Sequence, residues 1–253
     1  MRNIGLILRY DGTNYCGWQR QKNAISIQQR IEEAIEKVTG EQVFVQGCGR
    51  TDAGVHALNY LANFTTESKV PADKFMYAIN SFLPDDIAVM KSFETQEDFN
   101  SRFSISKKTY RYEISTQEIS DPFMRNYVWH FPYPLDVDFM NEQAKKIIGT
   151  YDFIGFMAVG GQVKTTVRTI YDALVFEENG KVIFEVTGNG FLYNMVRILA
   201  GTLCYLGAGK IKEDMSLILD SKDRARAGIT APPQGLYMKK VYIGEEYETE
   251  DKN

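Results

Sequence analysis

Cysteine and histidine are scarce in this sequence. Its 253 residues include three cysteines, Cys16, Cys48 and Cys204, and two histidines, His56 and His130. Cysteines so widely spaced argue against a disulfide framework and predict a reducing compartment, the cytoplasm. With two histidines and no Cys-x-x-Cys pattern, we expect no zinc site.

Long apolar runs are also missing. No stretch of about 18 apolar residues occurs, so we expect no transmembrane helix. Residues 1–8 are too short and too strand-like for a signal peptide. Hydrophobic residues make up 44% of the chain and charged residues 25%, which is ordinary for a soluble globular protein. At this length the chain could form one large domain or two small ones, and either could bury a core.

The net charge of −4 does not by itself exclude nucleic acid as a partner. Residues 245–253 hold five acidic residues and one lysine, so residues 1–244 are formally neutral and can still carry a basic face. Each basic cluster is, taken alone, more often a solvated surface than a binding site. The clusters are Lys107-Lys108-x-x-Arg111, Lys164 with Arg168, Lys222-x-Arg224-x-Arg226 and Lys239-Lys240.

Hydrophobic periodicity predicts the same order of elements, β-α-β-β-α-β, twice along the chain. This is the split βαβ order of ferredoxin-like folds, so we expect an α+β fold of two halves, 1–104 and 105–244, followed by an acidic tail, 245–253. The halves could share a largely antiparallel sheet with a catalytic cleft between them. Strands are predicted over 2–10, 43–46, 59–66, 87–94, 109–115, 167–177, 182–188 and 236–243. Helices are predicted over 26–38, 71–84, 136–148, 191–206, 213–219 and 221–226.

The segment 47–57 contains three glycines around an arginine, a threonine, an aspartate and a histidine. Glycines at this density let the backbone turn sharply and pass close to another group. A loop that places Arg50 beside Asp52 resembles a site more than a linker. The alternative is a polar turn in which Asp52 caps its own backbone.

The predicted helix over 191–206 is apolar nearly all round, which indicates a buried helix. Arg197 lies in its middle, and a buried guanidinium needs a carboxylate or equivalent partners. Asp52 is the partner that we would choose, and the arginine would keep it ionised. Equally, Arg197 could lie on an exposed stripe or extend to the surface.

Tyr110 and Tyr112 alternate on one predicted strand, with Lys107, Lys108 and Arg111 around them. Aromatic rings with cations on a sheet are typical of a surface that stacks a base and holds its phosphate. The more common use of such tyrosines is in a core.

Together, these motifs resemble the bacterial tRNA pseudouridine synthase A family from about residue 4 to residue 243. The block Gly49-Arg50-Thr51-Asp52-Ala53-Gly54-Val55-His56-Ala57 is highly specific. The other motifs follow the family's order: Tyr10-Asp11-Gly12-Thr13, Gly17-Trp18-Gln19, Tyr110-Arg111-Tyr112, Phe191-Leu192-Tyr193-Asn194-Met195-Val196-Arg197 and Gly235-Leu236-Tyr237.

The resemblance implies an isomerase that converts uridine to pseudouridine in the anticodon stem-loop of tRNA, at positions 38–40. It implies a homodimer that uses no cofactor and no metal. It also implies that Asp52 is the catalytic aspartate, Tyr110 the active-site tyrosine, Arg197 the partner of the aspartate, and Arg50 the residue that extrudes the target nucleotide. The other expected RNA contacts are Lys107, Lys108, Arg111, Lys164 and Arg168.

Three chemical pathways and two other functions stay open at this point. The carboxylate could add to the sugar, add to the base, or remove the 2′ proton to give a glycal. A non-catalytic RNA-binding module would not need the set of Asp52, Tyr110 and Arg197. A glycoside hydrolase would need a second carboxylate as acid partner, and none can be assigned.

Overall fold

The structure is a computed structural model that describes residues 1–161 and 163–243. Contacts divide the chain into two compact units. The first contains Met1–Ser106 and the last strand from Met238, and the second contains Lys107–Tyr237. The predicted halves, 1–104 and 105–244, had all of the last strand in the second. The predicted acidic tail, 245–253, lies outside the described residues.

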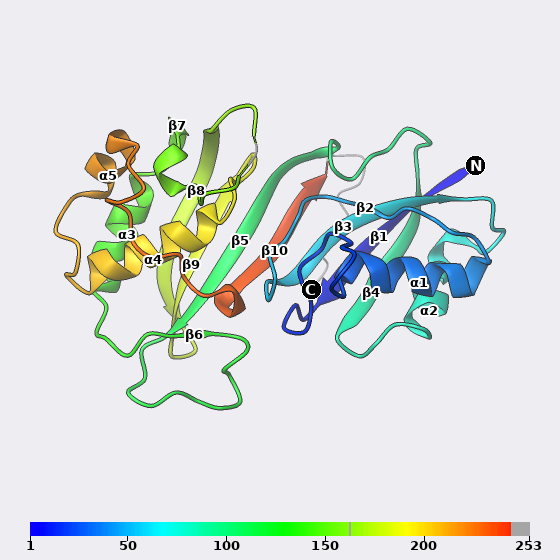
Figure 1. Cartoon of the computed structure of the whole chain (residues 1–253), viewed down its shortest axis with the longest axis horizontal. Helices are drawn as coiled ribbons and strands as arrows, with labels where there is room; N and C mark the ends of the chain where they lie inside the picture. Colours follow the sequence, from blue (N-terminus) through cyan, green and yellow to red (C-terminus); the bar gives the residue numbers. More distant parts are fainter. Residues whose placement is uncertain (162, 244–253) are drawn as a thin grey trace. The chain divides into compact units, whose positions relative to one another are not determined.

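The first unit has the predicted order of elements (Figure 1). Its strands are ordered β4-β1-β3-β10, and β1 is antiparallel to both β3 and β4. Asn80 ends α2 and fastens it to β4, because its side chain exchanges two hydrogen bonds with the backbone of Val89. The elements are β1 (Arg2–Tyr10), α1 (Ile27–Thr39), β2 (Gln46–Gly47), β3 (His56–Thr66), the 3-10 turn η1 (Ala72–Lys74), α2 (Phe75–Asn80) and β4 (Ile87–Thr95).

Local sequence explains both ends of α1. Ser26 caps the first turn by accepting a hydrogen bond from the backbone N–H of Gln29 at 3.2 Å. Gly40 ends the helix with φ +74°, a conformation that glycine adopts without strain. Ser26 and Gln29 have the spacing of a capping box, but its reciprocal half does not form, because the Gln29 side chain donates to Glu33 instead.

The part of the chain from β5 to β10 repeats the order with two short strands added, although residues 238–243 of β10 belong to the first unit. The strands of the second unit are ordered β5-β9-β8-β7, and β6 pairs parallel to β5. Asn179 and Gly180 have φ of +50° and +72°, as the tight hairpin between the antiparallel strands β8 and β9 requires. The elements are β5 (Ile105–Ser115), β6 (Trp129–His130), α3 (Val137–Lys145), β7 (Gly149–Asp152), η2 (Ile154–Phe156), β8 (Val167–Glu178), β9 (Lys181–Gly188), α4 (Met195–Gly207), α5 (Met215–Ser221), η3 (Pro233–Gly235) and β10 (Leu236–Ile243).

Several predicted elements are shorter or absent. The helix predicted over 71–84 is limited to η1 and α2, and the helix predicted over 136–148 is limited to α3. Residues 43–45 are not a strand, because the N–H and carbonyl of Val45 bond to the side chains of Glu32 and Gln28. Helix α4 begins only at Met195, since Asn194 has φ +59°. The predicted helix over 221–226 does not form, because Lys222 adopts φ +55° and ends α5.

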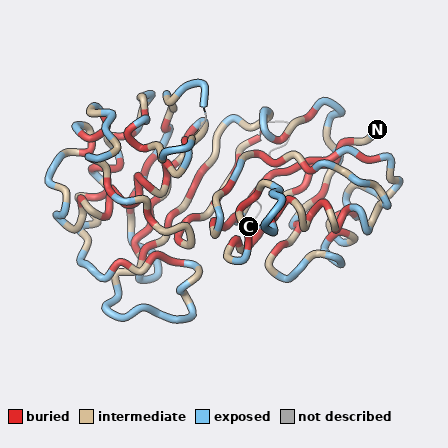
Figure 2. Tube along the Cα trace, viewed as in Figure 1, coloured by how far each residue is buried: buried red, intermediate tan, exposed pale blue. Residues whose placement is uncertain are grey.

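The predicted class, α+β with a largely antiparallel sheet, is confirmed. Buried residues follow the strands and the inner helix faces, and the connecting loops are exposed (Figure 2). In the first unit, α1 contributes its predicted apolar face to the core. In the second unit, α3 packs against β8 and α4. A cleft between the halves stays a prediction.

Candidate active site

The loop that carries Asp52 is fastened at both ends by antiparallel pairing. It leaves β2, where Gly47 pairs with Ala62, and it enters β3 at His56. Past β2, the N–H of Cys48 still donates to the carbonyl of Leu61 at 2.9 Å. Since β2 and β3 are paired in one sheet, both ends of the short loop between them are fixed by the sheet.

Three aromatic side chains form a floor under this loop. The rings of Trp18 and Tyr60 stack with centroids 4.1 Å apart, and Tyr10 packs against both. The Tyr60 hydroxyl donates to the carbonyl of Gly49 at 2.5 Å. The Tyr10 hydroxyl shares a hydrogen bond of 3.0 Å with Oγ1 of Thr51. Gly49 and Thr51, on the N-terminal side of Asp52, are thus fixed by the aromatic residues.

Gly17 lies in direct contact with the backbone at Asp52. Its φ is +98°, and a Cβ there would stand 2.3 Å from the carbonyl oxygen of Thr51 and 3.0 Å from the carbonyl carbon of Asp52. The next residue, Trp18, donates its N–H to that same Thr51 oxygen at 3.2 Å. On the other side, the Val55 N–H donates to the carbonyl of Asp52 at 3.2 Å and closes a turn. The backbone at Asp52 is held from two directions, while its side chain is partly exposed.

His56 lies at the end of the loop, where β3 begins. It is buried, and its Nδ1 accepts a hydrogen bond from the N–H of Gly12 at 3.1 Å. Asp11 Oδ1 also lies 3.1 Å from Nδ1. Asp11 Oδ1 also accepts two hydrogen bonds from Thr13. His56 therefore links the start of β3 to the turn over residues 11–13.

Tyr110 lies in the second unit, on β5 opposite Val186. It is 8% exposed, and Phe191 meets its ring edge-on, with centroids 5.1 Å apart and planes at 85°. Two residues further along β5, Tyr112 is fully buried, and its hydroxyl donates to the carbonyl of Pro232 at 2.6 Å. The two tyrosines therefore differ: Tyr112 is a core residue, and Tyr110 is at the margin of the core.

Arg197 is partly buried in α4, and its guanidinium is oriented by polar partners. Its Nε donates to the carbonyl of Ala231 at 2.7 Å, and its Nη1 donates to Oδ1 of Asn194 at 2.7 Å. The Ala231 N–H donates in return to the carbonyl of Arg197 at 3.1 Å. These bonds fix the direction of the side chain, so Arg197 is more than a cation extending into solvent.

The segment 228–232 that holds Arg197 is itself packed tightly onto α4. A Cβ on Gly201 would stand 2.0 Å from the carbonyl oxygen of Ile229. The Gly228 N–H donates to Oγ1 of Thr202 at 2.9 Å. This close approach depends on the two glycines, because any larger side chain would push the segment away from the helix.

The expected RNA contacts have different surroundings. Arg111 bonds to three carboxylates, of Glu113, Glu178 and Glu185. Burial alone would lower the pKa of Arg111, but these partners raise it above its usual value. A guanidinium with three carboxylate partners is poorly suited to bind a phosphate, so the geometry does not favour this role for Arg111.

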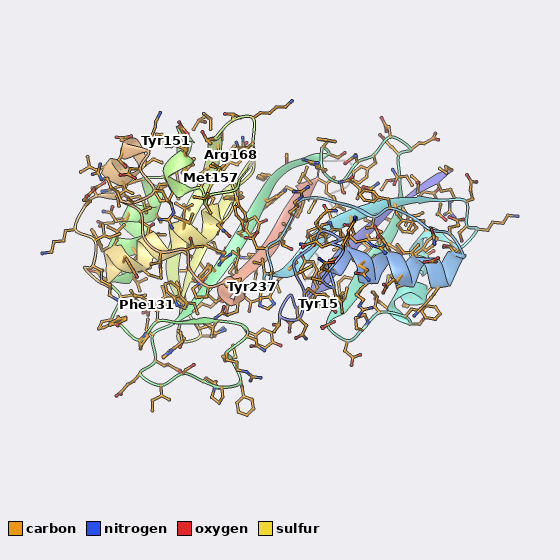
Figure 3. All side chains as sticks on the ribbon, in the orientation of Figure 1. Tyr15, Phe131, Tyr151, Met157, Arg168 and Tyr237 are labelled. Carbon is orange, nitrogen blue, oxygen red and sulfur yellow. The ribbon has the colours of Figure 1, made fainter. Side chains whose placement is uncertain are left out.

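The remaining cations differ mainly in exposure. Arg168 lies on β8 opposite Tyr151 of β7, and both are labelled in Figure 3. Burial lowers the pKa of Arg168, and its Nη1 donates to the backbone carbonyls of residues 165 and 167. Lys164 and Arg50 are exposed, whereas Lys107 and Lys108 are partly buried.

The structure brings Arg50 and Asp52 together on one loop of the first unit, and it places Tyr110 and Arg197 in the second unit. That Asp52 meets Tyr110 and Arg197 stays a prediction. The sequence did not reveal the floor of Tyr10, Trp18 and Tyr60 or the segment that holds Arg197. The aromatic floor could have been found from the sequence, since Tyr10 and Trp18 belong to family motifs that had no assigned role. No pattern in the sequence pointed to the segment that holds Arg197.

Among residues 1–161 and 163–243, no three His, Cys, Asp or Glu side chains gather as metal ligands would. The absence of a cofactor stays a prediction. In the same part of the chain, none of the helices has the length and hydropathy that crossing a membrane requires.

Comparison with known proteins defines the class. The family model described as tRNA pseudouridine synthase matches residues 6–104 and 143–242. The matched segments include the Asp52 loop and the Arg197 helix, whereas Tyr110 lies between them. The chain belongs to the tRNA pseudouridine synthase family, and the predicted enzyme class, an isomerase, is confirmed.

Relatives that are about 50% identical to this chain are named "tRNA pseudouridine synthase A". The protein of Thermoanaerobacter sp. (strain X514) is 51% identical over 242 residues, covering 95% of this chain and 99% of the relative. The protein of Caldicellulosiruptor bescii is also 51% identical, and that of Clostridium acetobutylicum 48%, with the same coverage. The predicted resemblance is thereby confirmed. A solved structure titled "Crystal Structure of a Cbf5-Nop10-Gar1 Complex" aligns at 12% identity with a TM-score of 0.35 over 95% of this chain and 60% of that one, which is too low to support an argument.

Proposed function

We propose that this enzyme isomerises uridine to pseudouridine in the anticodon stem-loop of tRNA, at positions 38–40, with Asp52 as the catalytic carboxylate. The observation that carries the proposal is the match of the family to the segment around Asp52, in a chain about 50% identical to relatives named for this activity. The rigid mounting of the Asp52 backbone supports it, because a nucleophile must be held close to its attack position.

The reaction breaks the N1–C1′ bond of the target uridine and forms a C5–C1′ bond, so the uracil must leave, turn and reattach. Asp52 adds to the sugar or to the base, or removes the 2′ proton to give a glycal. All three pathways need an ionised carboxylate at the mouth of a pocket. Atoms balance without an oxidant or an external energy source, because the product is an isomer of the substrate.

Arg197, Tyr110 and Arg50 have separate roles in this proposal. Arg197 pairs with Asp52, keeps it ionised and aims it. Its two bonds to Ala231 and Asn194 support this role, because they fix the direction in which the guanidinium points. Tyr110 stacks on the uracil and can accept the C5 proton at the end of the reaction.

Arg50 fills the space that the target base leaves. Extruding a stacked base costs a few kcal/mol, and a cation inserted in its place offsets part of that cost. Arg50 is exposed and lies two residues from Asp52, which supports the assignment. Lys107, Lys108, Lys164 and Arg168 contact the RNA backbone outside the target base.

The proposal also includes a homodimer that acts in the cytoplasm. The family resemblance supports the dimer, and three free cysteines fit a reducing compartment. Light scattering coupled to size exclusion would measure the mass directly. A monomeric mass at the concentrations of the assay would contradict the dimer.

The central experiment replaces Asp52 by Asn, which removes the charge and keeps the shape. We expect the variant to bind an anticodon stem-loop RNA and to form no pseudouridine. Asp73→Asn is a matched control, because Asp73 is an exposed carboxylate of the same unit that pairs with Lys74. Pseudouridine formed by Asp52→Asn at the rate of the control would refute the assignment.

Two further readouts separate the alternatives. Turnover by the wild-type protein distinguishes an enzyme from an RNA-binding module, and release of free uracil would reveal a glycoside hydrolase. Arg197→Ala should lower turnover strongly while circular dichroism and thermal unfolding show that the fold persists. Full activity of that variant would contradict the pairing of Arg197 with Asp52.

A further inference from the structure

A hollow of about 690 Å³ lies in the first unit at the start of α1. Its lining contains two cations, Arg20 and Lys22, three side-chain amides and no carboxylate. We propose that this hollow binds the sugar–phosphate backbone of the substrate RNA close to the target uridine. The inference rests on the proposed function. The lining residues are Arg20, Gln21, Lys22, Asn23, Ala24, Ile25 and Gln29.

The charge of the lining favours an anionic ligand. A neighbouring hollow of about 460 Å³ shares Arg20 but also contains three glutamates, Glu32, Glu33 and Glu36, so its formal charge is −2 against +2 for the first. A phosphate diester is therefore favoured in the first hollow and repelled from the second. The amides add neutral donors and acceptors of the kind that bind ribose hydroxyls.

Arg20 is oriented by one ion pair, and its side chain stays accessible to a ligand. Its Nη1 lies 2.8 Å from Oε2 of Glu32, which is buried, while 55% of the Arg20 side chain is exposed. Because a guanidinium offers five N–H donors in a fixed plane, it can pair with this carboxylate and with a phosphate at once. The buried side chain of Gln28 accepts from the Arg20 N–H at 2.9 Å and fixes the backbone too.

The loop around the hollow is closed on itself and tied to the Asp52 loop. The Cys16 N–H donates to the carbonyl of Ile25 at 2.9 Å, so the ends of the loop meet. Trp18, which donates to the Thr51 carbonyl beside Asp52, is two residues before Arg20. Two residues span at most about 7 Å of extended chain, so the hollow lies within a few nucleotides of the target base.

The first turn of α1 leaves the binding to side chains. The N–H groups of Ile27 and Gln28 donate to the carbonyls of Gly17 and Trp18 at 3.2 and 3.1 Å. That of Gln29 donates to Ser26. With these donors engaged, Lys22 and Arg20 carry the interaction with phosphate. Lys22 is the better residue to test, because Arg20 also pairs with Glu32 and would lose that contact when replaced.

The test measures binding of an anticodon stem-loop RNA to the full chain as a function of salt. Each phosphate contact contributes a slope of about 0.7 to 0.9 in log K against log salt. We expect Lys22→Ala to reduce the slope by that amount and to raise KM with kcat unchanged, and Lys22→Arg to restore both. Lys69→Ala, an exposed lysine of the same unit outside the hollow, should behave as wild type.

The outcomes also separate this inference from the proposed function. If Lys22→Ala keeps the wild-type slope and KM while the wild type makes pseudouridine, the hollow does not bind the RNA and the proposed function stands. If the wild type makes no pseudouridine, the proposed function fails, and a reduced slope for Lys22→Ala would still support RNA binding at the hollow. A slope reduced equally by Lys69→Ala would show a diffuse charge effect and overturn the inference.

Discussion

Gly17→Ala is the sharpest test of how the fold positions the catalytic carboxylate. The substitution adds one carbon atom and removes no group that is expected to contact the target base. That atom would stand 2.3 Å from the carbonyl oxygen of Thr51 and 3.3 Å from the nitrogen of Ala53. Both neighbours are backbone atoms of the Asp52 loop. They cannot rotate away, so the loop itself has to shift.

The size of the effect follows from these distances. Real Cβ atoms essentially never approach closer than 3.0 Å, so the Thr51 carbonyl must retreat by at least the difference, 0.7 Å. A displacement of about 1 Å at a reacting group can lower the rate about 100-fold. We therefore expect kcat/KM to fall by roughly two orders of magnitude, equivalent to about 2.7 kcal/mol of transition-state stabilisation. The strained φ adds about 1–2 kcal/mol of lost stability.

Gly40→Ala separates strain from displacement. Gly40 has a similar φ of +74°, but in the described part of the chain nothing lies within 4 Å of its added Cβ. It should lose stability by about 1–2 kcal/mol and keep its activity. Initial rates of pseudouridine formation on a stem-loop RNA, with denaturant unfolding of both variants, give the comparison. If Gly17→Ala retains activity within about threefold of Gly40→Ala, a margin below 0.7 kcal/mol, the reasoning is wrong.

Two further predictions concern stability in the second unit. Tyr112→Phe should lower the free energy of unfolding by about 1 kcal/mol, because the partly buried carbonyl of Pro232 loses its donor; an unchanged denaturation midpoint would contradict this. The Lys146 ammonium and the hydrogen bonds of Ser216 lower the pKa of Asp214, so its carboxylate stabilises the fold above the unfolded-state pKa of about 3.9 and loses that effect as the pH falls through the lower folded-state value. Asp214→Asn keeps the helix cap; it should cost under about 1 kcal/mol at pH 7, and this cost should shrink progressively as the pH falls below about 3.9. Acid unfolding curves measure the cost, and a cost that stays constant with pH would exclude the ion pair.

Elements with local determinants could be predicted from the sequence. Ser26 and Gly40 define α1 through capping chemistry that involves neighbouring residues alone. Asn179 and Gly180 specify their turn through their own backbone preferences. Asp52 and its glycines were recognised for the same reason, because all the residues of the motif are adjacent in sequence.

Features that depend on distant residues could not be predicted. Val45 fits a strand by composition, but Glu32 and Gln28 of α1 take its hydrogen bonds. Arg197 was expected to need a polar partner, and Asp52 was the choice from the residue types. The partner is instead the backbone carbonyl of Ala231, 34 residues away. Because every residue has such a carbonyl, the identity of residue 231 does not indicate this contact.

The division of the chain into two units has a consequence for its folding during synthesis on the ribosome. The first unit lacks β10 until residues 238–243 have been made, because β10 is the neighbour of β3. The 131 residues of Lys107–Tyr237 are translated in between. At about 5–20 residues per second this takes roughly 7–26 s. For that time, the backbone groups of β3 that pair with β10 stay unpaired at one edge of the nascent sheet. The first unit is therefore the first to be started and the last to be completed. A chaperone would have its longest opportunity to bind at this edge.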